Sequence, residues 1–194
     1  RIDAEQVSGV IKTPAAPLPL PFLIDSLHGT VSLWSLLTLS PHLEATASLY
    51  GGNCQVSLLP LMAGGFRSID LQCDSLRLEK YPALEFYKVR GLLSGDAKLQ
   101  SSNKATVSIR LRNGSIEEPK RISMLAPEQI ADVSLDATAE LEERRATIKS
   151  ISLTSSLGTA SGKGLLVTNE RGFLSNESSL AVEISLSETG EAAI

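Results

Sequence analysis

The sequence is poor in the residues on which catalysis and metal binding usually depend. Its 194 residues include two histidines and two cysteines, and aromatic residues make up only 4% of the chain. It contains no His-x-x-x-His pair and no Gly-x-Ser-x-Gly segment, so neither a helical zinc motif nor a nucleophile elbow is indicated. We therefore expect a protein that is not an enzyme, with no catalytic residues, no cofactor and no metal site.

A basic surface and long apolar runs are also lacking. Asp and Glu total 22 against 18 Lys and Arg, a net charge of −4, which gives no reason to expect binding to nucleic acid. No segment approaches the roughly 18 consecutive apolar residues of a membrane helix. Hydrophobic residues still make up 42% of the chain, enough for one folded domain over residues 1–194. Because the first residue is Arg, we expect a fragment whose N-terminal membrane anchor is missing.

Apolar and polar residues alternate one by one along most of the chain, as in a strand with one buried face. The clearest case is residues 131–141, where six apolar residues alternate with five polar ones. Pairs such as Gly51-Gly52, Gly64-Gly65 and Asn113-Gly114 fall where hairpin turns are needed. The expected fold is all-β, a long antiparallel meander forming a strongly twisted, curved sheet, either a half-barrel or a rolled sandwich. The expected strands cover residues 28–39, 42–50, 53–60, 67–78, 88–99, 104–112, 131–141, 146–155, 159–168 and 174–186, with a further candidate at 2–11.

Two segments depart from this alternation. Residues 14–22 contain four prolines in nine positions, which excludes a central strand and predicts an extended connector. This connector either lays its apolar side chains on the core or docks on an aromatic groove of a partner. Residues 119–130 are the only stretch that predicts a short helix.

The two cysteines can be placed by hairpin arithmetic. Cys54 and Cys73 are equally distant from the turn at residues 62–65, so they face each other across a simple hairpin. Val56 then faces Leu71 and Leu58 faces Ile69, all on one apolar face. A disulfide and a pair of small buried thiols both fit this register. The spacing lacks the Cys-x-x-Cys and neighbouring His of a zinc site.

The remaining reactive-looking features have structural explanations. His28 and His42 lie next to Gly29 and Pro41 and are expected at exposed loop or strand-edge positions. The segment 156–164 resembles a phosphate loop only superficially, because it has neither the first glycine nor the final Ser or Thr of that motif. Its glycines instead allow a turn and the close approach of neighbouring strands.

The apolar positions of the predicted strands form one face with two interpretations. They either pack into a closed core or line an open groove for an apolar ligand. With few aromatic residues and almost no helix to cover it, such a sheet must curl on itself, dimerise or hold a ligand. The residues on this face are Leu43, Ala45, Leu49, Val56, Leu58, Ile69, Leu71, Leu93, Val107, Ile109, Val133, Leu135, Leu180, Val182 and Ile184.

Several short segments of strand and glycine resemble a known family. They are Leu49-Tyr50-Gly51-Gly52 and residues 69–71, 76–84, 89–97, 111–116, 155–164 and 178–180. Together these segments resemble the periplasmic part of the type II secretion system protein N (GspN) family over roughly residues 18–186. Similar segments occur in the wider AsmA-like and TamB-like group of β-rich envelope proteins.

This resemblance implies a periplasmic β-domain of a single-pass inner-membrane protein in a Gram-negative bacterium. It implies a non-enzymatic role in type II protein secretion, with the secretin or inner-membrane platform components as partners and sheet edges that pair with a partner or a second copy. The AsmA-like relatives imply the alternative of a curved sheet whose apolar groove binds or transfers phospholipid. A periplasmic location would also favour a bond between Cys54 and Cys73.

Overall fold

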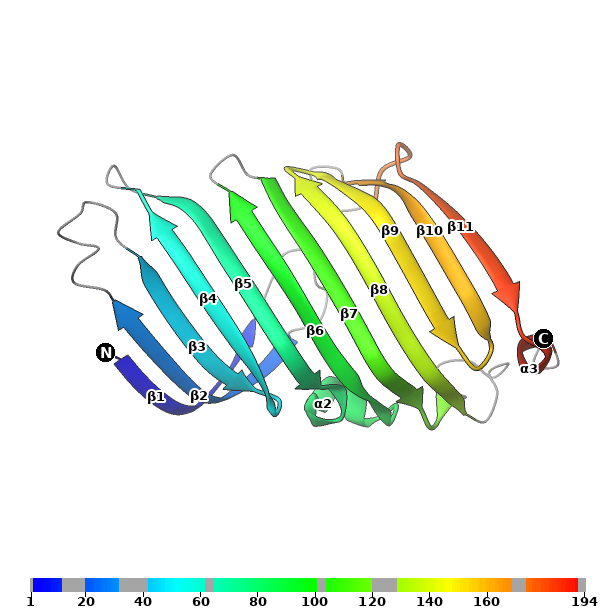
Figure 1. The fold of residues 1–194 in the computed structure, drawn as a ribbon, viewed down its shortest axis with the longest axis horizontal. Coiled ribbons are helices and arrows are strands. Elements are labelled where there is room, and N and C mark those ends of the chain that lie inside the picture. The colour runs from blue at the N-terminus through cyan, green and yellow to red at the C-terminus, as the bar shows by residue number, and fades with distance from the viewer. Residues whose placement is uncertain are drawn as a thin grey trace.

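A computed structural model describes residues 2–11, 20–31, 42–61, 65–100, 104–119, 129–168 and 174–191. These residues form one sheet of eleven strands in chain order from β1 to β11. Every neighbouring pair is antiparallel, and β1 and β11 lie at opposite ends of the sheet (Figure 1). The predicted all-β meander is therefore confirmed, as an open curved sheet.

The strand boundaries follow the predicted alternation closely in most of the chain. The strands are β1 (Ile2–Ile11), β2 (Leu20–Val31), β3 (Leu43–Leu49), β4 (Gly52–Pro60), β5 (Phe66–Arg77), β6 (Val89–Gln100), β7 (Lys104–Ile116), β8 (Ile130–Glu142), β9 (Arg145–Ser155), β10 (Gly158–Val167) and β11 (Ser179–Leu186).

The second strand differs from the prediction. We expected a strand at residues 28–39 after a proline-rich connector at 14–22, but β2 begins at Leu20 and Pro21 pairs with Val10 of β1. Strand β3 pairs with β2 only from Ile24 onward, so among the described strands Pro21 has a partner only in β1. Proline, which cannot donate a ladder hydrogen bond, is tolerated at such edge positions. Residues 12–19 and 32–41 lie outside the described part of the chain.

Tight turns close the hairpins where they are described. Tyr50 and Gly51 both have positive φ, +50° and +73°, as a two-residue type I′ turn requires. The predicted turn at residues 112–114 is wrong, because β7 continues to Ile116 and the register shifts around Asn113, whose φ is +52°. A residue with left-handed backbone conformation occurs both in hairpin turns and in β-bulges, so the Asn-Gly sequence alone did not distinguish a turn from a bulge.

Bulges of this kind lie in neighbouring strands near one end of the sheet. Residues with positive φ occur at Ser75 in β5, Gly91 in β6, Asn113 in β7 and Asp132 in β8. The register shifts put an extra residue in β5 near Ser75, in β7 near Asn113 and in β8 near Asp132, and Gly91 lies opposite the β7 bulge. Each bulge adds a residue to its strand and increases the local bend and twist. Together they curve the sheet at this end, where β5 leads into the first helical turn.

The described helices are all short. They are the 3-10 helix η1 (Leu78–Lys80), α2 (Pro82–Glu85) and α3 (Glu188–Glu191). The alternation did not predict these turns, since three or four residues are too few to show a helical period. The helix expected at residues 119–130 lies mostly outside the described residues, and Ile130 begins β8.

Candidate functional site

The pairing register brings the predicted apolar residues together on one face, hereafter the apolar face. Residues directly opposite in a ladder share a face, so the register defines four rows that cross the sheet. The first row is Leu43, Leu58, Ile69, Leu99, Ala105, Leu141, Ala146 and Leu166. The second is Ala45, Val56, Leu71, Ala97, Val107, Ala139, Ile148, Gly164 and Leu180. The third is Ala47, Cys54, Cys73, Gly95, Ile109, Ala137, Ile151, Gly162 and Val182. The fourth is Leu76, Leu93, Leu111, Leu135, Leu153, Ala160 and Ile184. Two further predicted residues, Leu49 and Val133, each lie two positions beyond a row and share its face.

The cysteine register is confirmed. Cys54 and Cys73 are direct cross-strand partners, as are Val56 with Leu71 and Leu58 with Ile69. The two cysteines form a disulfide with their Cα atoms 4.1 Å apart, so the interpretation as free thiols is wrong. The bond joins β4 to β5 in the third row of the apolar face.

The opposite face is polar and carries ion pairs that cross from strand to strand. Arg112 Nη1 lies 2.9 Å from Asp136 Oδ2, and Arg110 Nε lies 3.2 Å from Asp136 Oδ1. Lys149 pairs with Glu140 at 2.8 Å. These side chains are about half exposed, where ion pairs add little stability, and they mark this face as the one turned to water.

Asp136 provides a test of this arrangement. Hydrogen bonds and charge from Arg112 and Arg110 lower the pKa of its carboxyl below the usual 3.8, against a smaller opposing effect of desolvation. The stability contributed by this carboxylate is therefore present above the unfolded-state pKa and lost as the pH falls through the lower folded-state value. A carboxyl NMR titration should give a midpoint below 3.8, moving up in Arg112→Gln, and a wild-type midpoint at or above the usual value would contradict the pairing.

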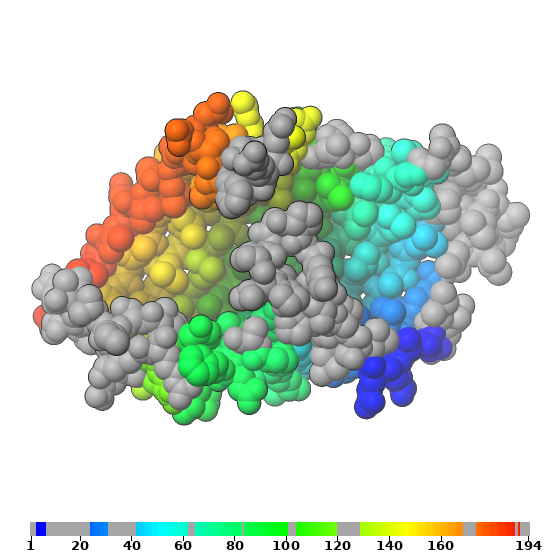
Figure 2. All heavy atoms as spheres, turned by 180° about the vertical axis from the view of Figure 1, so that it is seen from behind, coloured from blue at the N-terminus to red at the C-terminus, as the bar shows by residue number. Residues whose placement is uncertain are grey.

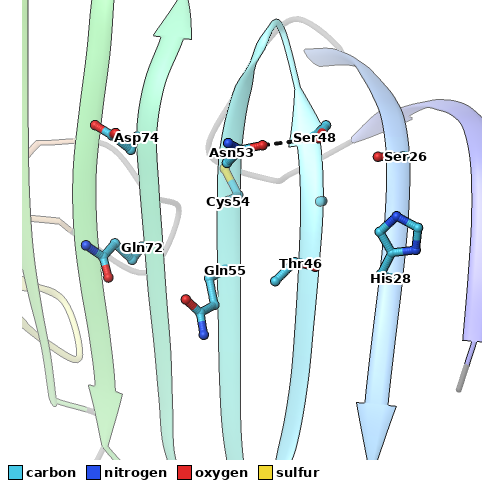
Figure 3. A pocket seen from close by; sticks show the side chains of 10 residues that line it. Ser26, His28, Thr46, Ser48, Asn53, Cys54, Gln55, Gln72 and Asp74 are labelled. Atoms are coloured by element: carbon cyan, nitrogen blue, oxygen red, sulfur yellow. Dashed lines mark hydrogen bonds between the residues drawn. The ribbon is translucent and has the colours of Figure 1, made fainter.

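A depression of about 480 Å³ lies on the polar face over β2 to β5 (Figure 3). It is lined by Ser26, His28, Thr46, Ala47, Ser48, Asn53, Cys54, Gln55, Gln72 and Asp74. Several of these groups already bond within the sheet: Ser48 donates to Asn53 at 3.2 Å, and Asp74 accepts from Ser94 at 2.8 Å. Hydroxyl and amide groups in an open depression can hold water or a neutral polar ligand.

His42 is half-buried, and His28 has an exposed side chain, as predicted, but is not at a strand edge. It lies within β2 on the polar face, with Nδ1 2.7 Å from Asp3 Oδ1. His42 Nε2 lies 2.7 Å from Ser57 Oγ. The described residues contain no group of three or more His, Cys, Asp or Glu side chains able to hold a metal ion.

Figures 1 and 3 together show from which side the polar face is seen. In Figure 1, β2 points up and lies to the left of β5, whereas in Figure 3 it points down and lies to the right. A rotation by 180° within the plane of the page relates the two views, so both show the same face of the sheet. The polar face therefore faces the reader in Figure 1 and the apolar face in Figure 2. On that side the sheet is hollowed between β11, in orange and red, and β3 and β4, in blue and cyan (Figure 2).

The apolar face is open in the described part of the molecule. Among the hydrophobic residues of the described part of the chain, only Cys54, on this face, and Val167, on the opposite face, are buried. Large side chains in the rows remain exposed, including Leu71 at 38%, Ile109 at 41% and Leu153 at 36%. The described elements include no second sheet, and their helices are turns of three or four residues. A closed core buries such side chains almost completely, so the described residues by themselves do not close a core over this face.

Sequence reasoning missed part of this face. Ile148 and Ile151 belong to it although they are three residues apart, because the register shifts at Thr138 and Ala139 opposite them. Strict alternation does not survive a bulge. Leu99, Leu111, Leu141 and Leu153 also lie on the face. Their alternate positions in the predicted strands were the available signal.

The comparisons with known proteins do not identify the chain. No protein-family model matches the sequence, and no curated protein and no solved structure shows significant similarity to it. Membership of the GspN family therefore stays a prediction. In the described part of the chain no helix has the length and apolar composition needed to cross a membrane.

The edge strand β11 depends on glycines in β10. A Cβ atom at Gly158 would lie 2.2 Å from the Ser185 carbonyl oxygen, and Gly158 has a φ of +142°. We expect Gly158→Ala to lower the unfolding free energy by about 1–3 kcal/mol and to speed amide exchange in β11. Gly65→Ala is the matched control, because Gly65 has a φ of +86° with nothing within 4 Å. Equal effects of the two substitutions would contradict the close approach of β11.

Proposed function

We propose that this protein binds the acyl chains of phospholipids on the apolar face of its open sheet. The observation that carries the proposal is the set of exposed large apolar side chains in the middle rows of that face, such as Leu71 and Ile109. Soluble proteins rarely leave a continuous apolar surface of this kind in water unless it binds something. Burial of that surface against hydrocarbon is favourable and needs no polar group for recognition.

The alternation of small and large side chains across this face suits acyl chains that lie parallel to the strands. In the second and third rows, β8 contributes Ala139 and Ala137 and β10 contributes Gly164 and Gly162, while β7, β9 and β11 contribute larger side chains. Strands that flank a given strand are about 10 Å apart, so the larger side chains of β7 and β9 border the alanines of β8. Over β10, by contrast, the Ile151 and Val182 side chains come within 3.3 Å of where a Cβ atom of Gly162 would lie. At 13 residues, β8 is long enough for an acyl chain, since one leaflet of a bilayer is only about 15 Å of hydrocarbon.

A periplasmic location is part of this proposal. The disulfide between Cys54 and Cys73 supports it, because such bonds persist in oxidising compartments and are rare in the cytosol. The proposal assigns binding and transfer of lipid to the chain and no catalytic step.

Lipid analysis of the purified protein tests the proposal. The chain is produced in a bacterial periplasm, purified without detergent, extracted and analysed by mass spectrometry. We expect phospholipid in stoichiometric amounts. A monodisperse protein free of lipid would contradict the proposal.

A second candidate function is a structural role in the type II secretion apparatus. The observation that favours it is the free edge of the sheet at β11, whose residues are all exposed, including Val182 at 48% and Ile184 at 70%. An exposed edge strand pairs readily with a strand of another protein. Secretin or inner-membrane platform components are the partners that the family resemblance implies.

A proline in β11 tests this second function. The carbonyl of Ala181 points toward β10, so the N–H of Val182, which belongs to the same trans peptide group, points away from β10. Val182→Pro should therefore abolish strand pairing with secretin or platform components in a pull-down and leave β11 in place. Ala181→Pro, which removes an N–H directed at β10, should loosen β11 itself. Unchanged capture by Val182→Pro would contradict edge pairing.

A further inference from the structure

Four of the aromatic residues in the described part of the chain lie at one end of the sheet, whereas Phe66 begins β5 at the other end. These four are Phe86 and all three tyrosines of the sequence, Tyr50, Tyr81 and Tyr87. Tyr50 occupies the β3–β4 turn, and the other three residues lie in or beside α2. The described strands supply the apolar face almost entirely with aliphatic side chains, so the aromatic cluster is a local feature of this end of the sheet.

The cluster is held together by ring contacts and backbone bonds. The rings of Tyr50 and Tyr81 meet edge to face with centroids 5.4 Å apart, and those of Phe86 and Tyr87 do so at 5.1 Å. The backbone N–H of Arg77 donates to the Tyr50 carbonyl at 3.1 Å, which ties the β3–β4 turn to the end of β5. Phe86 nevertheless remains 61% exposed, although it is among the most costly side chains to leave in water.

The charges around the cluster balance. The basic residues are Arg77, Lys80, Lys88 and Arg90, and the acidic residues are Glu79, Glu85, Glu117 and Glu118. Lys88 pairs with Glu118, and Arg90 pairs with Glu117 at 2.8 Å. A balanced set of charges around exposed aromatic rings has no electrostatic preference for an acidic or a basic partner. It matches the zwitterionic headgroup layer of a phospholipid bilayer, where tyrosine rings and neighbouring lysines are favoured.

The cluster adjoins the apolar face at the end where the sheet bends. Strand β5 runs from Leu76, in the fourth row, directly into η1 and α2, and η1 contacts β6. Figure 1 shows α2 at this end of the sheet, beneath β5 and β6. The fourth row carries leucine on five successive strands, β5 to β9. A bilayer that contacts the cluster would therefore meet the apolar face at its leucine-rich end.

We propose that the η1–α2 end of the sheet seats on the interfacial layer of a phospholipid bilayer, with Phe86 inserted and the tyrosines at headgroup level. Lipid then enters the apolar face at its fourth row. The role of this contact in lipid uptake rests on the proposed lipid binding, but the membrane contact itself is measured separately. Because Phe86 supplies burial and the charges cancel, attachment is weak, reversible and insensitive to salt.

Fluorescence at position 86 tests the insertion. In a Trp34→Phe background, Phe86→Trp is mixed with neutral phosphatidylcholine vesicles that contain lipids brominated in the acyl chains. We expect a blue shift and quenching of Trp emission, unchanged by added salt. Leu174→Trp in the same background is the matched control, because Leu174 is 63% exposed and lies away from α2; its emission should not change. An unshifted, unquenched spectrum at position 86 would overturn the proposal.

Transfer from vesicles separates this proposal from lipid binding itself. Phe86→Ala should slow uptake of phospholipid from vesicles by about tenfold, as expected when one aromatic side chain no longer enters an apolar layer. Its affinity for lysophosphatidylcholine below the micellar concentration should equal that of wild type, and Leu174→Ala should match wild type in both assays. Unchanged uptake by Phe86→Ala would overturn the membrane contact and leave lipid binding intact. If wild type does not bind lysophosphatidylcholine, but position 86 still inserts into vesicles, the proposed lipid binding would be overturned and the membrane contact supported.

Discussion

Ile109→Asp should remove bound phospholipid from the purified protein while leaving the sheet folded. Ile109 lies in the third row between Gly95 and Ala137, in the middle of the apolar face, and is 41% exposed. A carboxylate there retains water in the absence of lipid, so the unfolding free energy should fall by only about 1 kcal/mol. Contact with an acyl chain would strip that water, and lipid content should fall at least about tenfold.

Thr106→Asp is the matched control on the same strand. Thr106 belongs to the polar face, where its cross-strand neighbours are Lys98 and Glu140, so an added carboxylate meets one charge of each sign. This variant should retain the lipid content of wild type. Lipid analysis by mass spectrometry and circular dichroism on both variants check the prediction. Equal lipid content in the two would show that the apolar face is not the binding site.

Loss of the disulfide should produce the largest change in stability. The bond between Cys54 and Cys73 closes a loop with a sequence separation of 19, and such a cross-link typically contributes about 2–4 kcal/mol by restricting the unfolded chain. Cys54→Ala with Cys73→Ala should lower the unfolding free energy by that amount in urea titrations. Reducing agent should have the same effect on wild type and none on the double variant, which serves as the control.

Thiol labelling provides the opposing outcome. In the native oxidised protein Cys54 is only 8% exposed, and both sulfurs are bonded, so neither should react. Labelling of both cysteines without reductant, or an unchanged urea midpoint in the double variant, would contradict the bond.

The β4–β5 register was predictable from sequence because two independent signals agreed. Symmetry about the turn paired Cys54 with Cys73, and alternation placed Val56 opposite Leu71, as the structure confirms. A slip by one residue would have moved every one of these side chains to the other face. Where a hairpin is simple and one face is apolar, local pattern alone determines the pairing.

Bulges and strand starts were harder to predict. Asn113-Gly114 has the composition of a hairpin turn, but here Asn113 lies at a bulge and Gly114 presses against the Val133 carbonyl, 2.7 Å from where a Cβ atom would lie. Pro21 enters β2 only because β3 does not reach it. Both outcomes depend on what the neighbouring strand does, which the local sequence does not contain.

The openness of the apolar face was also beyond the sequence. The alternation of Val107 and Ile109 with polar residues is the same in a sandwich, a closed barrel and an open sheet. Only the tertiary arrangement, with β1 and β11 at opposite ends of one sheet, distinguishes a groove from a packed core. The sequence predicted which residues form the site and left open whether a second layer covers them.

Photo-crosslinking with a phospholipid that carries a diazirine in its acyl chain tests the central claim most directly. The lipid is loaded onto the protein, irradiated, and the modified residues are mapped by peptide mass spectrometry. We predict crosslinks at apolar-face positions such as Val107, Ile109, Ile151 and Val182, and none at polar-face positions such as Ser108 or Thr138. Crosslinks spread over both faces, or confined to the polar face, would contradict the account.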